Sequence, residues 1–266
     1  MQPLRRFVLL SLLLALLVGC GRPAPLQNAN TPQAPVVKPD FTDADPKDFP
    51  VKHPRRYPVH GIDAARYQGA IDWQIAARSG VSFAYLKATE GGDGLDPAFA
   101  TNWQGAAGAG IPRGAFHFYY WCRPAAEQAR WFIANVPRSA RALPPVLDLE
   151  WTPFSPTCTL RPAASEVRAE AETFLNILEN HYGQRPLIYT SPEFFATNQL
   201  GRIPRTEFWP RSVADHPSNT YPNQAWTFWQ YSSTGGVPGV QGPVDTNVFA
   251  GSIAAWQAWL AARSQP

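Results

Sequence analysis

The chain has 266 residues, of which 45% are hydrophobic and 16% are charged. Disordered chains are rich in charge and poor in aromatic residues, so ten Trp, nine Tyr and fifteen Phe exclude disorder throughout the chain. The formal net charge is +3, but Arg5 and Arg6 belong to an N-terminal leader, and the rest of the chain has 21 basic and 20 acidic residues. Proteins that bind nucleic acid carry a basic surplus or a Lys/Arg cluster, so we expect no nucleic-acid partner.

The N-terminus has the features of a bacterial export signal. Two arginines precede an apolar run of twelve residues, 7–18, which is too short to span a bilayer and is typical of a secretory signal. The run ends in Leu17-Val18-Gly19-Cys20, which resembles the bacterial lipobox, where cleavage precedes a Cys that carries the lipid. We therefore expect residues 1–19 to be a signal peptide and Cys20 to be lipidated, with an ordinary signal and a chance Cys as the alternative. A residue other than Asp after that Cys usually implies the outer membrane, so Gly21 predicts an exported, lipid-anchored protein facing the periplasm.

Residues 20–58 differ in composition from the rest of the chain. Nine prolines lie between Gly21 and Pro58, with Ala, Asn and Gln between them and few large aliphatic residues. Such a segment cannot bury enough apolar area to fold, and it behaves as a semi-rigid extended spacer. We expect a disordered linker that holds a domain away from the membrane surface; a tail without a role is the alternative.

The two remaining cysteines, Cys122 and Cys158, form an even pair in an oxidising compartment. We expect a disulfide between them, which would close a loop of roughly 37 residues and stabilise the fold by about 3–4 kcal/mol. Two cysteines without a nearby His make a poor zinc site, so we expect no metal.

Residues 59–266 alternate between short apolar runs and helical patterns. The strands predicted from the apolar runs are Val59–Asp63, Val81–Ala88, Gly114–Tyr120, Pro145–Glu150, Leu187–Thr190, Glu207–Arg211, Thr227–Tyr231 and Val244–Phe249. The helices predicted from apolar spacing are Ile71–Ser79, Pro97–Ala109, Ala125–Asn135, Ala163–Tyr182, Glu193–Gln199 and Ser252–Arg263. This alternation predicts an α/β fold with a parallel sheet, closed as an irregular and incomplete relative of the (β/α)8 barrel. In such barrels the catalytic side chains lie at the C-terminal ends of the strands.

Two carboxylates end the strand Pro145–Glu150. Asp148 and Glu150 alternate with Leu147 and Leu149, so they share a face and lie about 7 Å apart at the backbone. Two carboxylates so close cannot both ionise without cost, which raises the pKa of one of them. One then serves as a protonated acid and the other as an anion, as in glycosidases; a pair that binds a cation or caps a loop is the alternative.

Further acids lie at other strand ends. Asp63 ends the first predicted strand, and Asp245 lies on the last. Closing a barrel brings the first and last strands together, so the four acids should face one cleft. The surrounding aromatic residues are suited to stacking on sugar rings, although most aromatic residues in any chain are core; they are Tyr67, Phe118, Tyr119, Trp151, Trp229 and Tyr231.

Six segments in series resemble glycoside hydrolase family 25, the Chalaropsis-type lysozymes. They are residues 61–73, with Gly61-Ile62-Asp63 and Ile71-Asp72-Trp73; Phe83–Gly91; Ala109–Phe118; Asp148-Leu149-Glu150; Trp229–Ser233; and Val244-Asp245-Thr246-Asn247. The resemblance implies a (β/α)5(β)3 barrel that hydrolyses the β-1,4 bond from N-acetylmuramic acid to N-acetylglucosamine in peptidoglycan. It also implies a monomer without a cofactor, whose partners are glycan strands and, through the anchor, a membrane.

The resemblance assigns roles to individual residues. Glu150 matches the general acid, and Asp148 matches the partner that orients or stabilises the acetamido group of the substrate. Asp63 and Asp245 match the remaining acids of the cleft. The candidate substrate-binding residues are Gln68, Lys87, Glu90, Tyr119, Trp229, Gln230, Tyr231 and Asn247. Lys87 and Glu90 could instead pair with each other, and His117 is expected to be a buried structural imidazole.

Two other functions are compatible with these patterns. A catalytically silent wall-binding module would use the same cleft, but it should lack one of the acids, and all four are present. A hydrolase of chitin-like glycans would also carry an acid-X-acid strand. The products of a digest distinguish these possibilities.

Overall fold

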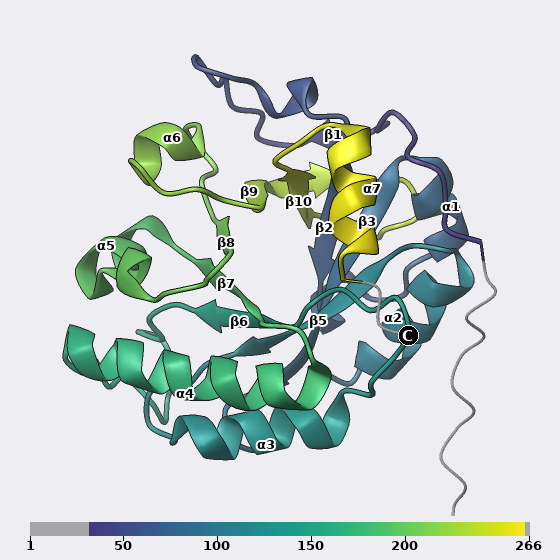
Figure 1. The fold of residues 1–266 in the computed structure, drawn as a ribbon. Helices are drawn as coiled ribbons and strands as arrows, with labels where there is room; N and C mark the ends of the chain where they lie inside the picture. The colour runs from purple at the N-terminus through teal and green to yellow at the C-terminus, as the bar shows by residue number, and fades with distance from the viewer. Residues whose placement is uncertain (1–31, 264–266) are drawn as a thin grey trace, which may run out of the picture.

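The computed structural model describes residues 32–263 (Figure 1). The predicted signal peptide and the lipidation site Cys20 lie outside the described residues. Among residues 32–263, no helix is both long enough and apolar enough to cross a membrane.

The fold is a mixed α/β fold around one strongly curled sheet (Figure 1). Along the sheet the strand order is β1-β9-β10-β2-β3-β5-β6-β7-β8, and β4 is attached to β3. The strands from β2 to β8 in that order pair in parallel, whereas β9 and β10 pair antiparallel to their neighbours in it. A bridge between Arg211 and Gln230 brings β8 against β9, so the sheet curls back towards itself. The strands are β1 Thr42–Asp43, β2 His60–Ala64, β3 Val81–Glu90, β4 Gly94–Leu95, β5 Arg113–Phe118, β6 Val146–Leu149, β7 Leu187–Thr190, β8 Phe208–Pro210, β9 Phe228–Gly236 and β10 Val244–Phe249.

The longer helices connect the parallel strands and pack on the outside of the sheet; α3 and α4 lie side by side (Figure 1). The α4 helix shows why the sequence forms them: Val167, Phe174 and Leu178 recur at helical spacing and are fully buried. Gly183 then ends it in the left-handed conformation. The helices are α1 Trp73–Arg78, α2 Phe99–Gly108, α3 Ala125–Asn135, α4 Ala164–Tyr182, α5 Pro192–Asn198, α6 Pro217–Thr220 and α7 Ile253–Ala261. Every strand and helix predicted for residues 59–266 has a counterpart, while β1, β4 and α6 were not predicted.

The strands divide the core into two parts because successive side chains point to opposite faces. On β3, Ala84 and Leu86 belong to the outer cluster beneath the helices. Phe83 and Tyr85 point inward and pack with Trp256 of α7 in a second cluster enclosed by the sheet. The inward face of β3 continues past this second cluster to Lys87, which lines the cavity described below.

Residues 32–58 correct the expectation of a disordered linker over 20–58. Thr42 and Asp43 form β1 on the edge of β9. Phe49 and Tyr57 are buried against Trp229. The prediction was based on the many prolines and overlooked these two aromatic residues. They bury enough apolar surface to hold an otherwise extended segment on the domain.

Cys122 and Cys158 form a disulfide in the structure, with their Cα atoms 5.6 Å apart. This is the pairing expected from the sequence. The bond joins the segment after β5, where Cys122 follows Trp121, to the loop after β6, where Cys158 follows Glu150. It therefore constrains the loop that follows the acid pair.

Candidate active site

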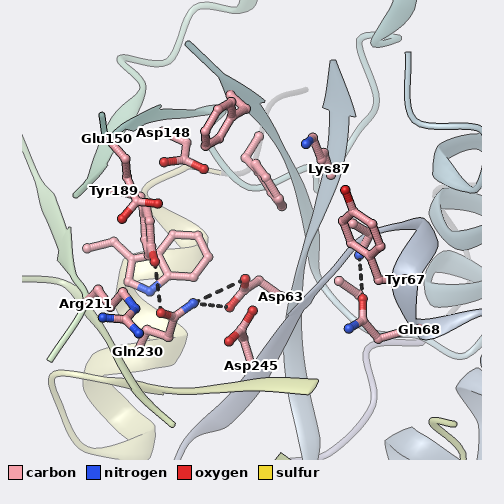
Figure 2. A pocket seen from close by; sticks show the side chains of 15 residues that line it. Asp63, Tyr67, Gln68, Lys87, Asp148, Glu150, Tyr189, Arg211, Gln230 and Asp245 are labelled. Carbon is pink, nitrogen blue, oxygen red and sulfur yellow. Dashed lines mark hydrogen bonds between the residues drawn. The ribbon is translucent and has the colours of Figure 1, made fainter. Parts of the chain in front are cut away.

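The inward-facing residues at the C-terminal ends of the parallel strands line a cavity of about 350 Å³ (Figure 2). This volume is within the range of small-molecule sites. All four predicted acids line it: Asp63, Asp148, Glu150 and Asp245. The other side chains around the cavity are those of Ala64, Ala65, Tyr67, Gln68, Lys87, Phe116, Phe118, Tyr189, Trp209, Arg211 and Gln230.

Asp148 and Glu150 project from the end of β6 into the cavity (Figure 2). Burial and the neighbouring Glu150 raise the pKa of Asp148 well above its usual value, and one of its oxygens, Oδ1, is buried without a hydrogen-bond partner. Burial also raises the pKa of Glu150, an effect that Arg211 opposes. The sequence predicted a raised pKa for one member of the pair and an anion for the other. In the structure, burial favours a proton on both.

Asp63 is held by a network of amide donors. Gln230 Nε2 donates to both of its oxygens, at 3.1 and 3.3 Å, and Asn247 Nδ2 donates to Oδ1 at 2.7 Å. The amides are themselves oriented, since Tyr189 Oη donates to Gln230 Oε1 and Trp209 Nε1 donates to Asn247 Oδ1. These hydrogen bonds favour the anion and oppose the effect of burial, which raises the pKa of Asp63.

Asp245 is the neighbour of Asp63 on the adjacent strand β10. Burial and the charge of Asp63 raise the pKa of Asp245 to about 8. At neutral pH, Asp245 therefore holds a proton and can donate it to Asp63 in a hydrogen bond.

The polar wall around Lys87 differs from the prediction in one respect. Lys87 Nζ lies 2.6 Å from Glu90 Oε2, and Lys87 lines the cavity while Glu90 does not. Gln68 also lines the cavity, and its side chain binds the backbone at Ala65 and Pro243. Glu90 therefore pairs with Lys87, which was the alternative to binding substrate.

Besides Glu90, four predicted substrate-binding residues do not line the cavity. Trp229 is fully buried and Tyr231 bonds His60, both on the outer face of β9. Tyr119 is buried beneath the helices, where its hydroxyl donates to Glu170. Strand parity explains these errors, because Gln230 faces inward and its two neighbours therefore cannot. Asn247 does not line the cavity, but it is hydrogen-bonded to Asp63 and Trp209, which do.

Tyr189, Trp209 and Arg211 line the cavity but were not among the predicted site residues. All three lie on predicted strands, 187–190 or 207–211, and Tyr189 and Arg211 lie near the C-terminal ends of theirs. That position, combined with inward parity, was the signal that could have identified them.

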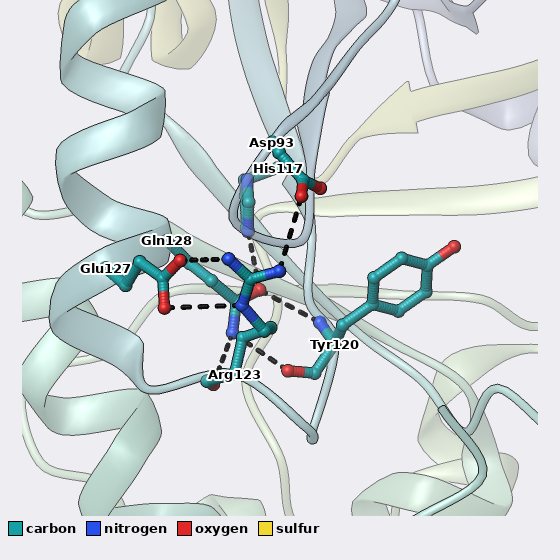
Figure 3. Close-up of polar contacts among 6 residues, drawn as sticks. All are labelled: Asp93, His117, Tyr120, Arg123, Glu127 and Gln128. Carbon is teal, nitrogen blue, oxygen red and sulfur yellow. Dashed lines mark hydrogen bonds and ion pairs between the residues drawn. The ribbon is translucent and has the colours of Figure 1, made fainter. Parts of the chain in front are cut away.

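His117 is a structural residue, as expected (Figure 3). It is fully buried, and its Nδ1 lies 2.7 Å from Thr89 Oγ1 and its Nε2 lies 3.0 Å from Gln128 Oε1. The Gln128 amide donates to the carbonyls of Tyr120 and Arg123, so its oxygen faces the ring and Nε2 carries the proton. Burial lowers the pKa of His117 to about 4, which keeps the ring neutral. Beside this network, Arg123 pairs with Glu127 and Asp93 (Figure 3).

The cavity combines carboxyl groups whose pKa values are raised by burial with aromatic side chains along its walls. Cleavage of a glycosidic bond needs a proton donor for the leaving oxygen and a second carboxyl group close to it. Flat aromatic walls suit the apolar faces of sugar rings. The fold and the site together define a glycoside hydrolase.

Comparisons with known proteins identify the family. The model of glycosyl hydrolases family 25 matches residues 62–240. The chain is 39% identical over 214 residues to lysozyme M1 of Streptomyces globisporus. The matched region covers 74% of this chain and 69% of the relative. It is also 37% identical over 221 residues to the protein YegX of Escherichia coli strain K12. That matched region covers 80% of this chain and 78% of the relative. The structure of a family 25 glycosyl hydrolase from Bacillus anthracis matches with a TM-score of 0.70 and 34% identity, over 78% of this chain and 95% of that one. The chain belongs to glycoside hydrolase family 25.

Proposed function

We propose that this enzyme is an N-acetylmuramidase that hydrolyses the β-1,4 bond between N-acetylmuramic acid and N-acetylglucosamine in peptidoglycan. The observation that carries the proposal is the placement of Asp148 and Glu150 together in a cavity opposite Asp63 and Asp245. The kinship with a lysozyme supports this choice of substrate. We infer that the curled sheet is the (β/α)5(β)3 barrel of the family.

Glu150 is the proposed general acid. Burial raises the pKa of Glu150 and so favours its protonated form, and that proton passes to the glycosidic oxygen as the bond to the sugar carbon breaks. Once deprotonated, Glu150 can accept a proton from the water that completes hydrolysis. The carbonyl of Glu150 accepts a hydrogen bond from Trp121 Nε1 at 3.1 Å, which holds its backbone in place.

Asp148 is the proposed partner of the substrate's acetamido group. Its buried Oδ1 has no partner within the described residues and is available to accept the amide N–H of the sugar. Positive charge that develops on the sugar during bond cleavage favours the ionised form of Asp148, despite the effect of burial. The acetamido group can then assist departure of the leaving group, a substrate-assisted route.

Asp63 and Asp245 are proposed to bind substrate or water and to set the charge of the cavity. The raised pKa of Asp245 favours its neutral form, which lowers the negative charge of the cavity. The amides of Gln230 and Asn247 hold Asp63 in place, so this pair forms a rigid wall.

The test is a digest of purified peptidoglycan analysed by mass spectrometry, with Glu150→Gln as the inactive control. New reducing ends on muramic acid that appear only with the wild type would support the proposal. Cleavage of chitin oligomers but not of peptidoglycan would favour the chitinase-like alternative. Binding to peptidoglycan without any cleavage would favour the silent module.

We also propose that the enzyme is exported, lipid-anchored through Cys20 and located at the outer membrane facing the periplasm. The proposal rests on the lipobox-like Leu17-Val18-Gly19-Cys20. Labelled fatty acid should appear on the wild type and not on Cys20→Ser, and the wild type should fractionate with outer membranes. An unlabelled wild-type protein would contradict the anchor without affecting the proposed hydrolysis.

A further inference from the structure

Arg211 is a basic residue of the cavity with a rigidly held backbone. Its N–H donates to Thr190 O at 3.0 Å, and its carbonyl accepts from Tyr221 Oη at 2.8 Å. It also forms the bridge with Gln230 that joins β8 to β9. The guanidinium therefore projects into the cavity from a fixed position, on the opposite side of the acids from Lys87 in the view of Figure 2.

The donors of this guanidinium have no partner within residues 32–263. The structure places no hydrogen bond or ion pair on it there, although four acids line the same cavity. Lys87, the other basic residue of the cavity lining, is already paired with Glu90 at 2.6 Å. Arg211 is thus the cation of the described cavity whose hydrogen-bonding capacity is available to a ligand.

The neighbouring acids are weak competitors for the guanidinium of Arg211. Burial raises the pKa values of Glu150 and Asp245, and a protonated carboxyl is a weak partner for a guanidinium. An arginine binds a carboxylate through two parallel N–H···O bonds, with a geometry that a lysine cannot reproduce.

We propose that Arg211 is a specificity-determining residue that binds a carboxylate carried by the muramic acid side of the glycan. This inference rests on the proposed function and deepens it. Muramic acid differs from glucosamine by a lactyl ether that ends in a carboxyl group, so a chitin-like chain offers no such anion. The carboxylate is either that of a free lactyl group or one on an attached peptide stem, and both present the same chemistry to Arg211.

The experiment measures binding, so that it does not depend on turnover. In a Glu150→Gln background, calorimetry compares three glycans of equal length: one with free lactyl carboxylates, the methyl ester of the same glycan, and one that keeps its peptide stems. Arg211→Met is compared with Arg211→Lys and with a control, Arg202→Met, at an exposed position outside the cavity.

We expect the parent to bind at least one carboxylate glycan more tightly than the ester. Arg211→Met should raise Kd for that glycan by roughly 10- to 100-fold, the usual range for a hydrogen bond to a charged group, and should change Kd for the ester by less than about twofold. Arg211→Lys should recover only part of the loss, and Arg202→Met should have no effect. A loss confined to the free-lactyl glycan would identify the lactyl carboxylate as the ligand, and a loss confined to the stem-bearing glycan would identify the stem.

Two results would overturn the inference. One is a parent that binds neither carboxylate glycan more tightly than the ester, and the other is an equal loss for all three glycans in Arg211→Met, which would mean that Arg211 acts only through the neighbouring acids. A parent that bound none of the glycans would instead contradict the proposed function itself, so the two failures are distinguishable.

Discussion

Asp245 lies directly across the antiparallel β2–β10 pair from Asp63, and burial together with the charge of Asp63 raises the pKa of Asp245 to about 8. Strands that are distant in the sequence thus bring these two carboxyl groups together in the cavity. The two carboxyl groups are not equivalent, because the side-chain amides of Gln230 and Asn247 donate to the carboxylate of Asp63 and favour its anion, whereas Asn247 Nδ2 reaches only the backbone carbonyl of Asp245. Asp245 therefore keeps the proton.

This relationship predicts the pH dependence of stability. The pKa of Asp245 is about 8 in the folded protein and near 3.8 when unfolded, so the folded state binds more protons between these values and stability falls as pH rises through that window. Asp245→Asn removes this loss, while its amide can still donate to Asp63. The variant should match the wild type near pH 3 and exceed it at pH 8, by about 1 kcal/mol or more. Urea unfolding at the two pH values checks this, and a constant difference would contradict it.

Glu150→Gln should lower kcat by about 10²- to 10⁴-fold, because the amide preserves the shape of the side chain and has no transferable proton. Folding and binding to peptidoglycan should be nearly unchanged. The matched control is Glu193→Gln, an exposed residue paired with Arg161, which should retain full activity. Residual activity of the Glu150 variant above a tenth of the wild type would exclude this role.

Asp148→Asn should cost a similar factor and should also flatten the acidic limb of the pH–rate profile. Burial raises the pKa of Asp148, so in the wild type the rate should fall when acid prevents its ionisation. Asn does not titrate, so the variant loses one of the two coupled proton titrations of the Asp148–Glu150 pair. A full pH profile of kcat/KM for both proteins decides the matter, and superimposable profiles would show that the pair does not work together.

The disulfide should contribute to stability and to the position of Glu150. Replacing Cys122 and Cys158 by Ser should lower the free energy of unfolding by about 3–4 kcal/mol, because the unfolded chain regains loop entropy. It should also lower kcat more than it raises KM, since the loop after Glu150 is released. Unfolding curves of the oxidised wild type and the double variant test the first point, and an unchanged midpoint would refute it.

Residues 32–57 should behave as part of the folded domain. A chain that begins at residue 58 loses the buried side chains of Phe49 and Tyr57, each worth about 1.5–3 kcal/mol, and exposes Trp229. It should unfold at a markedly lower temperature than a chain that begins at residue 32. Equal melting temperatures would mean that this segment adds nothing to the stability of the domain.

The sequence by itself determined the longer strands and helices of residues 59–263 and the four acids of the cavity. Hydrophobic spacing identified α4, with Gly183 at its end, because a buried helical face needs apolar residues at a period of 3.6. Alternation in Val146–Glu150 identified the acid pair for the corresponding reason in a strand. These are local patterns, and local physics is sufficient to read them.

Only the tertiary structure decided which side of each strand faces the cavity and what covers its other side. Trp229 and Tyr231 have the composition of sugar-binding residues, yet they face Phe49 and Tyr57 from the segment expected to be a spacer. In the sequence, Arg211 is an ordinary residue at the end of a strand. It lines the cavity with the acids only because the curl of the sheet brings β8 against β9. The reason is that parity along a strand is fixed locally, whereas which face is inside depends on how strands distant in sequence close around one another.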